Sequence, residues 1–189
     1  MAENGKTVLK AEIPTRQSLI VFFDDFAPEE LKTPWNERVA ESTQLDFDGA
    51  WERSLCRGID YPAFGEKETV TLPDDLAGQH PKFSGVIAYE NTFTLEKDYK
   101  ELLLEISDAY EGVQVYVNGQ SAGIQIVPVY RFDLSAFTAP GKNALRIEVS
   151  TTLERERRAG RESILEILQH NKVMQPTGIT GTVTLYGRD

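Results

Sequence analysis

Short apolar runs with a period of two residues are the feature that most constrains the fold of this chain. In each run apolar residues recur at every second position, which is typical of a strand with one buried and one solvated face. The apolar positions are Leu45, Phe47 and Trp51; Ile87, Tyr89, Phe93 and Leu95; Leu102, Leu104 and Ile106; Val113, Val115 and Val117; Leu145, Ile147 and Val149; Val183 and Leu185. Many short strands separated by turns at roughly 8 to 12 residue spacing indicate an antiparallel sandwich or barrel. We therefore predict an all-β, antiparallel fold of two face-packed layers with no interior space for a reaction centre.

The net charge limits the partners of the chain. Among its 189 residues, 20 basic and 30 acidic side chains give a formal charge of −10. This charge repels nucleic-acid phosphates and anionic membranes, so we predict neither as a partner. Neutral ligands such as sugars remain open.

Cysteine usage and hydropathy exclude further classes. Cys56 is the only cysteine, so no internal disulfide and no cysteine-rich zinc site can form. The N-terminal residues lack the apolar core of a signal peptide, and no run reaches the ~18 apolar residues of a membrane span. The compartment stays unknown.

The segment around Ser121 has two incompatible interpretations. Residues 119–123 match G-x-S-x-G, the strand-to-helix turn that exposes a serine nucleophile in hydrolases. The same region, with alternating valines leading into Asn118-Gly119, is typical of a β-hairpin closed by a type I′ turn. A second alternating run follows Ser121 where the hydrolase motif needs a helix, and only His80 and His170 could act as bases. We favour the hairpin and keep a small serine hydrolase as an alternative.

The acidic residues and histidines mark no catalytic or metal centre. No spacing identifies the pair of carboxylates that a glycosidase needs across a cleft. Neither histidine has a second ligand at i+3 or i+4, so solvent-exposed roles are favoured over zinc binding. Three acidic pairs could ligate a structural calcium ion together with loop carbonyls, although none lies in a twelve-residue calcium loop. They are Asp24 with Asp25, Asp46 with Asp48, and Asp74 with Asp75. We predict no catalytic residue and no cofactor, with a structural calcium as the alternative.

Aromatic residues could stack on sugar rings, because an aromatic face buries the apolar surface of a pyranose. The candidates are Trp35, Trp51 and Tyr130. Trp51 alternates with Phe47, which favours the core, whereas for Tyr130 both interpretations stay open. Asp133 is predicted to cap a turn rather than to bind sugar.

Three segments depart from the strand pattern. Residues 19–23 are apolar on both faces, as expected for the closing strand of a preceding module over residues 1–24. Residues 25–43 carry two prolines and many charges, and we predict a linker with one helical turn at 28–32. The sandwich then spans residues 44–189. It includes a late excursion at 154–172 whose short helix is indicated by the spacing of Ile164, Leu165, Ile167 and Leu168.

Several stretches carry a family resemblance in their order along the chain. They are LDFDGAW (45–51), LPDD (72–75), SGVIAYENTFTL (84–95), ISDAYEGVQVYVNGQSAG (106–123), YRFDLSAF (130–137), PGKNALRIEVS (140–150) and PTGITGTVTLY (176–186). Together they resemble the sugar-binding, jelly-roll domain of glycoside hydrolase family 2, a galactose-binding-like β-sandwich. KFSGVIAY and PTGITGTV are similar to segments of large bacterial enzymes related to α-L-rhamnosidases, which implies an excised C-terminal piece of a multidomain glycosidase.

The resemblance brings no catalytic centre, because in these enzymes the catalytic residues sit on a barrel of ~250 residues. It implies a noncatalytic accessory module that contacts the catalytic domain and a preceding β module of the parent enzyme, and that could also bind an oligosaccharide. Rigidly held loops are the usual place for such contacts. The carbohydrate-binding candidates are therefore His80, Asp108, Glu111, Tyr130 and Arg131, together with the excursion at 154–172. A free-standing, lectin-like domain is the alternative.

Overall fold

The computed structural model describes residues 2–3, 6–9, 11–13, 18–21, 33–74, 76–159 and 176–189. Strands make up most of the regular structure in these ranges, and the helices are short. In chain order the elements are β1 (Ala2–Glu3), β2 (Lys6–Thr7), α1 (Trp35–Ala40), β3 (Thr43–Leu45), β4 (Trp51–Arg57), β5 (Glu68–Val70), α2 (Leu76–Gln79), β6 (Gly85–Leu95), β7 (Glu101–Ile106), β8 (Ala109–Tyr110), β9 (Gly112–Val117), β10 (Gln120–Gln125), β11 (Tyr130–Asp133), the 3-10 turn η1 (Ser135–Phe137), β12 (Gly141–Ser150), α3 (Glu154–Ala159), β13 (Gly178–Ile179) and β14 (Val183–Arg188).

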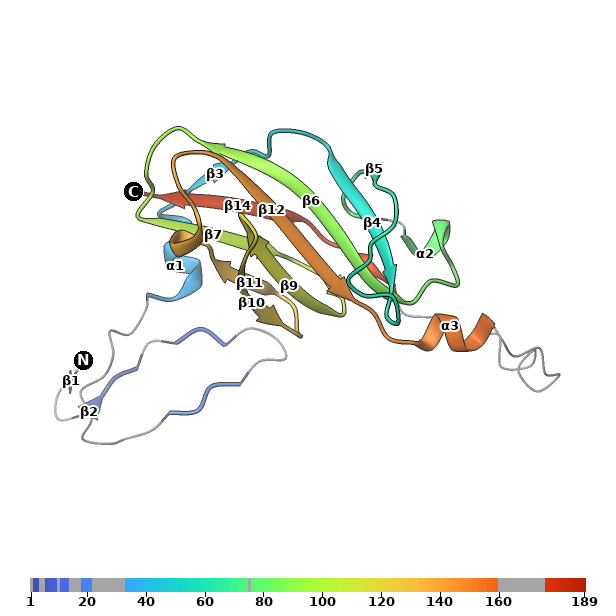
Figure 1. Cartoon of the computed structure of the whole chain (residues 1–189). Coiled ribbons are helices and arrows are strands. Elements are labelled where there is room, and N and C mark those ends of the chain that lie inside the picture. Colours follow the sequence, from blue (N-terminus) through green and yellow to red (C-terminus); the bar gives the residue numbers. More distant parts are fainter. Residues whose placement is uncertain are drawn as a thin grey trace.

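Two antiparallel sheets form the body of the molecule (Figure 1). The larger has six strands in the order β10-β9-β12-β6-β4-β5, and the smaller has four in the order β11-β7-β14-β3. Strands that follow one another along the chain repeatedly change sheet, as in β6 to β7 and β11 to β12, which gives the jelly-roll path. The predicted all-β sandwich is confirmed. In the part of the chain that the structure describes, no helix has the length and apolarity needed to cross a membrane.

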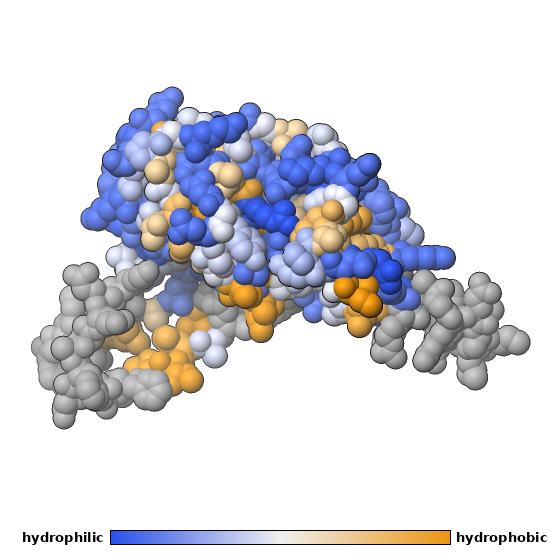
Figure 2. All heavy atoms as spheres, in the orientation of Figure 1, coloured by the Kyte–Doolittle hydropathy of each residue, from blue (hydrophilic) through white to orange (hydrophobic). Residues whose placement is uncertain are grey.

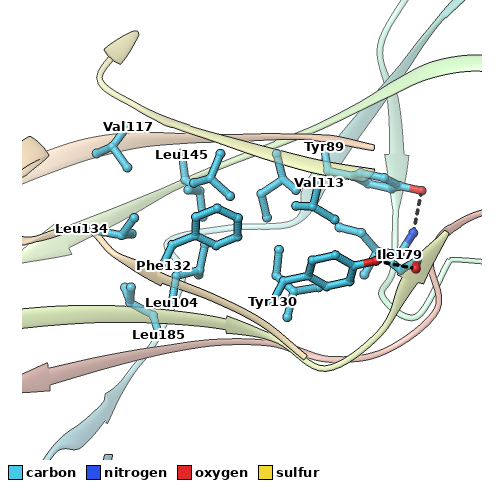
Figure 3. Close-up of a cluster of buried hydrophobic side chains, with 14 of the residues drawn as sticks. Tyr89, Leu104, Val113, Val117, Tyr130, Phe132, Leu134, Leu145, Ile179 and Leu185 are labelled. Carbon is cyan, nitrogen blue, oxygen red and sulfur yellow. Dashed lines mark hydrogen bonds between the residues drawn. The ribbon is translucent and has the colours of Figure 1, made fainter. Parts of the chain in front are cut away.

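The core lies between the two sheets and is built from the alternating apolar positions (Figure 3). Val113, Val117 and Leu145 project from the larger sheet toward Leu104 and Leu185 of the smaller one, and each is at most 1% exposed. Burying each such side chain contributes about 1.5–3 kcal/mol relative to leaving it in water. Because apolar residues recur at every second position, the long strands direct one face into the core between the sheets.

The hairpin predicted around Asn118 and Gly119 is confirmed. Strands β9 and β10 pair in antiparallel register, with Val117 opposite Gln120. Asn118 and Gly119 have φ values of 51° and 79°, which is the left-handed pair that a type I′ turn requires. A strand therefore follows Ser121 where a nucleophile elbow would need a helix. The Ser121 hydroxyl accepts a hydrogen bond of 3.3 Å from the side chain of Gln114.

Helix α1 lies in the second half of the segment predicted to be a linker. Its Arg38 is 6% exposed and donates to Glu101 on β7 at 3.1 Å and to Asp133 on β11 at 2.7 Å. Alternation places both carboxylates on the outer face of the smaller sheet. Helix α1 therefore packs on that face, and Leu103, between Glu101 and Glu105 on it, is fully buried.

The other departures from the strand pattern lie partly outside the described ranges. Leu19, Ile20 and Val21 have no regular structure and are 50%, 74% and 45% exposed. The helical turn predicted at 28–32, the helix predicted from Ile164 to Leu168, and His170 lie outside the described residues. Helix α3 begins the late excursion, ten residues before Ile164.

Candidate functional site

A hollow lies on the outer face of the six-stranded sheet. It has a volume of about 800 Å³ and spans strands β4, β6, β9 and β12, and we call it the outer-face hollow. Figure 2 shows a mostly hydrophilic surface on the side where β6 and β12 lie in Figure 1, with apolar areas along its lower edge. The hollow lies on the outer face of the sheet, away from the core between the sheets.

A row of polar side chains crosses the hollow from strand to strand. The register places Glu52 on β4 opposite Glu90 on β6, Glu90 opposite Arg146 on β12, and Arg146 opposite Tyr116 on β9. Directly opposed residues on one face have their Cβ atoms about 4.5–5.5 Å apart. Four residues that are distant in sequence thus form one continuous line.

Ion pairs fix this row. Lys67, which precedes β5, contacts Glu90 at 2.6 Å and Glu52 at 3.0 Å. Arg146 contacts Glu90 at 2.9 Å and Glu148 at 2.8 Å. Each cation therefore bridges two carboxylates, and Glu90 accepts from both cations.

The loop at residues 58–65 covers the outer face next to this row. The Tyr61 hydroxyl donates to Glu148 at 3.0 Å, and the Arg146 guanidinium lies 4.4 Å from the centre of the Phe64 ring. The hydrogen bond to Glu148, together with burial, raises the pKa of Tyr61 to about 12. Tyr61 therefore stays protonated at neutral pH and acts as a donor to the carboxylate.

Small residues form the floor of the hollow. Gly49, Ala50, Thr92, Gly119 and Ala144 line it, so no large side chain fills the space beside the charged row. Two hydrogen bonds hold the loop before β4 against β6: Asp48 N donates to the Thr92 carbonyl at 2.8 Å, and Asn91 Nδ2 donates to the Gly49 carbonyl at 2.9 Å. The arrangement offers donors and acceptors on rigid strands, whereas the carboxylates of Glu52, Glu90 and Glu148 are engaged in ion pairs.

The pH dependence of stability should report on this row. Burial alone would raise the pKa of Glu90, but hydrogen bonds from Lys67 and Arg146 hold it below the ordinary value of 4.5. A carboxylate with a lowered folded-state pKa stabilises the fold above its unfolded pKa, and this contribution disappears as the pH falls through the folded value. We expect Glu90→Gln to be less stable than the wild type near neutral pH, and the difference to shrink below about pH 4.5. Urea unfolding at a series of pH values measures the difference in free energy of unfolding between the variant and the wild type. A difference that stays constant with pH would contradict the prediction.

The structure places Tyr130 in the core, which corrects the prediction that it could stack on a sugar. The side chain is 1% exposed, and its hydroxyl donates to the carbonyl of Ala109 at 3.0 Å and to that of Glu111. Tyr130 and Phe132 occupy alternate positions of β11, and Phe132 is also buried. The alternation therefore already indicated that Tyr130 faces the core. No face of the ring is available to a ligand.

Arg131 and Trp35 come together on the outer face of the smaller sheet. Arg131 pairs with Glu105 at 3.1 Å and with Glu12 at 2.7 Å, and its guanidinium lies 5.5 Å from the Trp35 ring. Trp35 Nε1 donates to Glu105 at 2.9 Å. These contacts join α1 and the N-terminal arm to the sheet, so both side chains are engaged in packing.

The other predicted carbohydrate contacts lie in loops at one end of the sandwich. Asp108 accepts from the hydroxyl of Thr180 at 2.9 Å. Glu111 is exposed, and its amide donates to the carbonyl of Ser150. His80 follows α2 and is half-buried. The structure does not bring these side chains together with Arg131, which lies on an outer face.

The acidic pairs weighed as calcium ligands lie in different surroundings. Asp74 is bound by the Arg53 guanidinium at 2.8 and 3.0 Å and by the Tyr89 hydroxyl at 2.7 Å. Asp46 and Asp48 are exposed, and Asp48 accepts from Thr94 at 3.0 Å. Within the described ranges, no group of three or more potential ligands is positioned to hold a metal ion. Asp24, Asp25 and Asp75 lie outside these ranges.

The side chains of the hollow were missed because their positions depend on pairing. Within each strand they occupy the polar positions of the alternation, as Glu90 does between Tyr89 and Asn91. That pattern identifies a solvated face, but only the register of four strands shows which polar residues become neighbours. Asp133 was predicted correctly: it accepts from the amide and the hydroxyl of Ser135 and so caps the turn after β11.

Comparisons with known proteins identify the class of fold. No family model matches the sequence, and no curated protein matches it. Among solved structures, a rhamnosidase from Novosphingobium sp. PP1Y matches 77% of this chain with a TM-score of 0.62 and 24% identity. A β-glucuronidase from Faecalibacterium prausnitzii matches 86% with a TM-score of 0.56 and 17% identity. A β-glucuronidase of glycoside hydrolase family 2 matches 77% with a TM-score of 0.57 and 19% identity.

These matches confirm the predicted fold. The sandwich of this chain has the fold of a β domain that occurs within glycosidases. The chain spans only 15%, 33% and 18% of the length of those three proteins.

Proposed function

We propose that this chain is a noncatalytic accessory module of a multidomain glycoside hydrolase. The observation that carries the proposal is the match of its sandwich to a minor part of several glycosidase chains. The chemistry of the described residues agrees with it, because three of the four carboxylates that line the outer-face hollow are paired with Lys67 or Arg146. Catalysis in the parent enzyme is assigned to another domain.

Exposed apolar side chains support a role in docking. Ile124 is 64% exposed on the edge strand β10, and Ile126 just after it is 76% exposed. Leu19 to Val21 on the N-terminal arm are also exposed. Apolar areas of this kind mark contacts with other protein surfaces. We assign these contacts to the catalytic domain and to the preceding β module, whose closing strand we place in residues 1–24, with residues 25–43 as the connection.

The isolated chain is expected to show no turnover. The purified chain should not hydrolyse aryl glycosides or aryl esters above the background rate, and Ser121→Ala should leave that rate unchanged, since β10 provides no nucleophile elbow. Release of nitrophenol measures both. Turnover that disappears in Ser121→Ala would restore the hydrolase interpretation and overturn the proposal.

The accessory role can also be distinguished from a free-standing lectin. We propose that no cofactor is needed in either case. If the chain is an accessory module, fusing it to its catalytic domain should raise the thermal midpoint of that domain. A lectin would bind sugar without any such stabilisation.

A further inference from the structure

We propose that the outer-face hollow binds a neutral oligosaccharide laid across the strands of the six-stranded sheet. The inference deepens the proposed function and rests on it for the class of ligand. It places the contact on a sheet face, whereas the sequence had indicated the loops with His80 and Asp108. The size, charge and rigidity of the hollow favour this ligand.

The size and rigidity of the hollow suit a short chain of sugars. Its volume of about 800 Å³ falls in the range of about 300–1,000 Å³ typical of ligand sites. Its floor includes small residues on paired strands, such as Thr92 opposite Ala144. A surface built on central strands changes little on binding, so the ordering cost is small.

The charge of the hollow favours a neutral ligand. Asp48, Glu52, Glu90 and Glu148 line it together with Lys67, Lys142 and Arg146, so four negative groups face three positive ones. An anionic sugar would find no excess of positive charge there and would approach a chain of charge −10. A neutral sugar can donate hydroxyl protons to the carboxylates and accept from the ammonium and guanidinium groups.

Tyr116 adds an apolar contact at one end of the row. It lines the hollow and is half-buried, so part of its side chain is available to a ligand. An aromatic side chain combines an apolar ring with a hydroxyl, which matches the mixed surface of a sugar. Tyr116 and the charged row thus provide both kinds of contact in one line.

Isothermal titration with neutral and acidic hexasaccharides tests the inference. The probes are cellohexaose, xylohexaose and mannohexaose, with hexagalacturonate as the acidic comparison. Ala144→Trp fills the hollow from an exposed floor position without removing an ion pair. Ser150→Trp is the matched control, since Ser150 is exposed on the same face of β12 and lies about 20 Å further along it. Thermal unfolding checks that both variants are folded.

We expect saturable binding of at least one neutral hexasaccharide, weakened about tenfold or more by Ala144→Trp and unchanged by Ser150→Trp. The inference is overturned if no neutral probe binds, if hexagalacturonate binds more tightly, or if binding survives Ala144→Trp. Loss of binding in His80→Ala or Asp108→Ala, with Ala144→Trp unaffected, would assign the contact to the loops. None of these outcomes contradicts the proposed accessory role. That role is contradicted instead if the isolated chain hydrolyses a substrate.

Discussion

Replacing Asp74 by alanine is expected to lower the free energy of unfolding by about 3–5 kcal/mol, because it leaves a buried guanidinium without its main partner. The side chains of Arg53 and Asp74 are 1% and 2% exposed and are joined by two hydrogen bonds. Arg53 Nη2 would keep Glu68 and Gln79, each at 2.7 Å, but Nη1 would lose both of its hydrogen bonds to Asp74, and Nε is already buried without a partner. Chemical denaturation of the purified variant measures the loss. Asp48→Ala is the control, since Asp48 is exposed and its loss should cost no more than about 0.5 kcal/mol.

A double variant separates the buried charge from the packing. Arg53→Met combined with Asp74→Leu removes both charges and keeps most of the volume, and such exchanges are often neutral or stabilising. The double variant should therefore be more stable than Asp74→Ala alone. Tyr89 would lose its acceptor on Asp74, but its hydroxyl still accepts from the amide of Ile179 at 3.3 Å. If the double variant is as unstable as Asp74→Ala, the loss comes from packing and not from the missing Asp74 partner of Arg53.

This buried pair shows one limit of prediction from the sequence. Trp51, Arg53 and Leu55 share a face of β4, so the alternation already places Arg53 on the side of the apolar residues. Its partner comes from the LPDD stretch, 21 residues away, and no local pattern connects the two. The sequence of β4 alone predicts the side of the sheet on which Arg53 lies. Only the tertiary structure shows that Asp74 neutralises its charge.

Local patterns predicted the elements that are formed by neighbouring residues. The hairpin at Asn118 and Gly119 follows from turn chemistry and alternating valines, and the Asp133 cap involves a residue two positions away. The outer-face hollow and the Arg131 cluster depend on strand order and on contacts across the chain. Glu12 and Arg131, for example, are 119 residues apart. Alternation reports which face a residue occupies, but not which strand lies beside it.

The second large effect is expected where β6 begins beside β4. A Cβ atom added at Gly85 would lie 2.1 Å from the carbonyl oxygen of Cys56, and the φ of Gly85 is +156°. The obstacle is the backbone of a paired strand, because Gly85 is the register partner of Arg57. Neither the backbone of Gly85 nor the carbonyl group of Cys56 can move without disturbing the hydrogen bonds that join β4 to β6.

Gly85→Ala should therefore lower the free energy of unfolding by about 3–5 kcal/mol, from backbone strain and overpacking together. Two further glycines separate these causes. At Gly119 the φ is +79° but nothing lies within 4 Å of the added Cβ, so Gly119→Ala should cost only about 1–2 kcal/mol. At Gly58 the space is also empty, and Gly58→Ala should change stability by no more than about 1 kcal/mol. Urea unfolding of the three variants should give this order. A Gly85→Ala variant no less stable than Gly119→Ala would show that β6 does not approach β4 so closely.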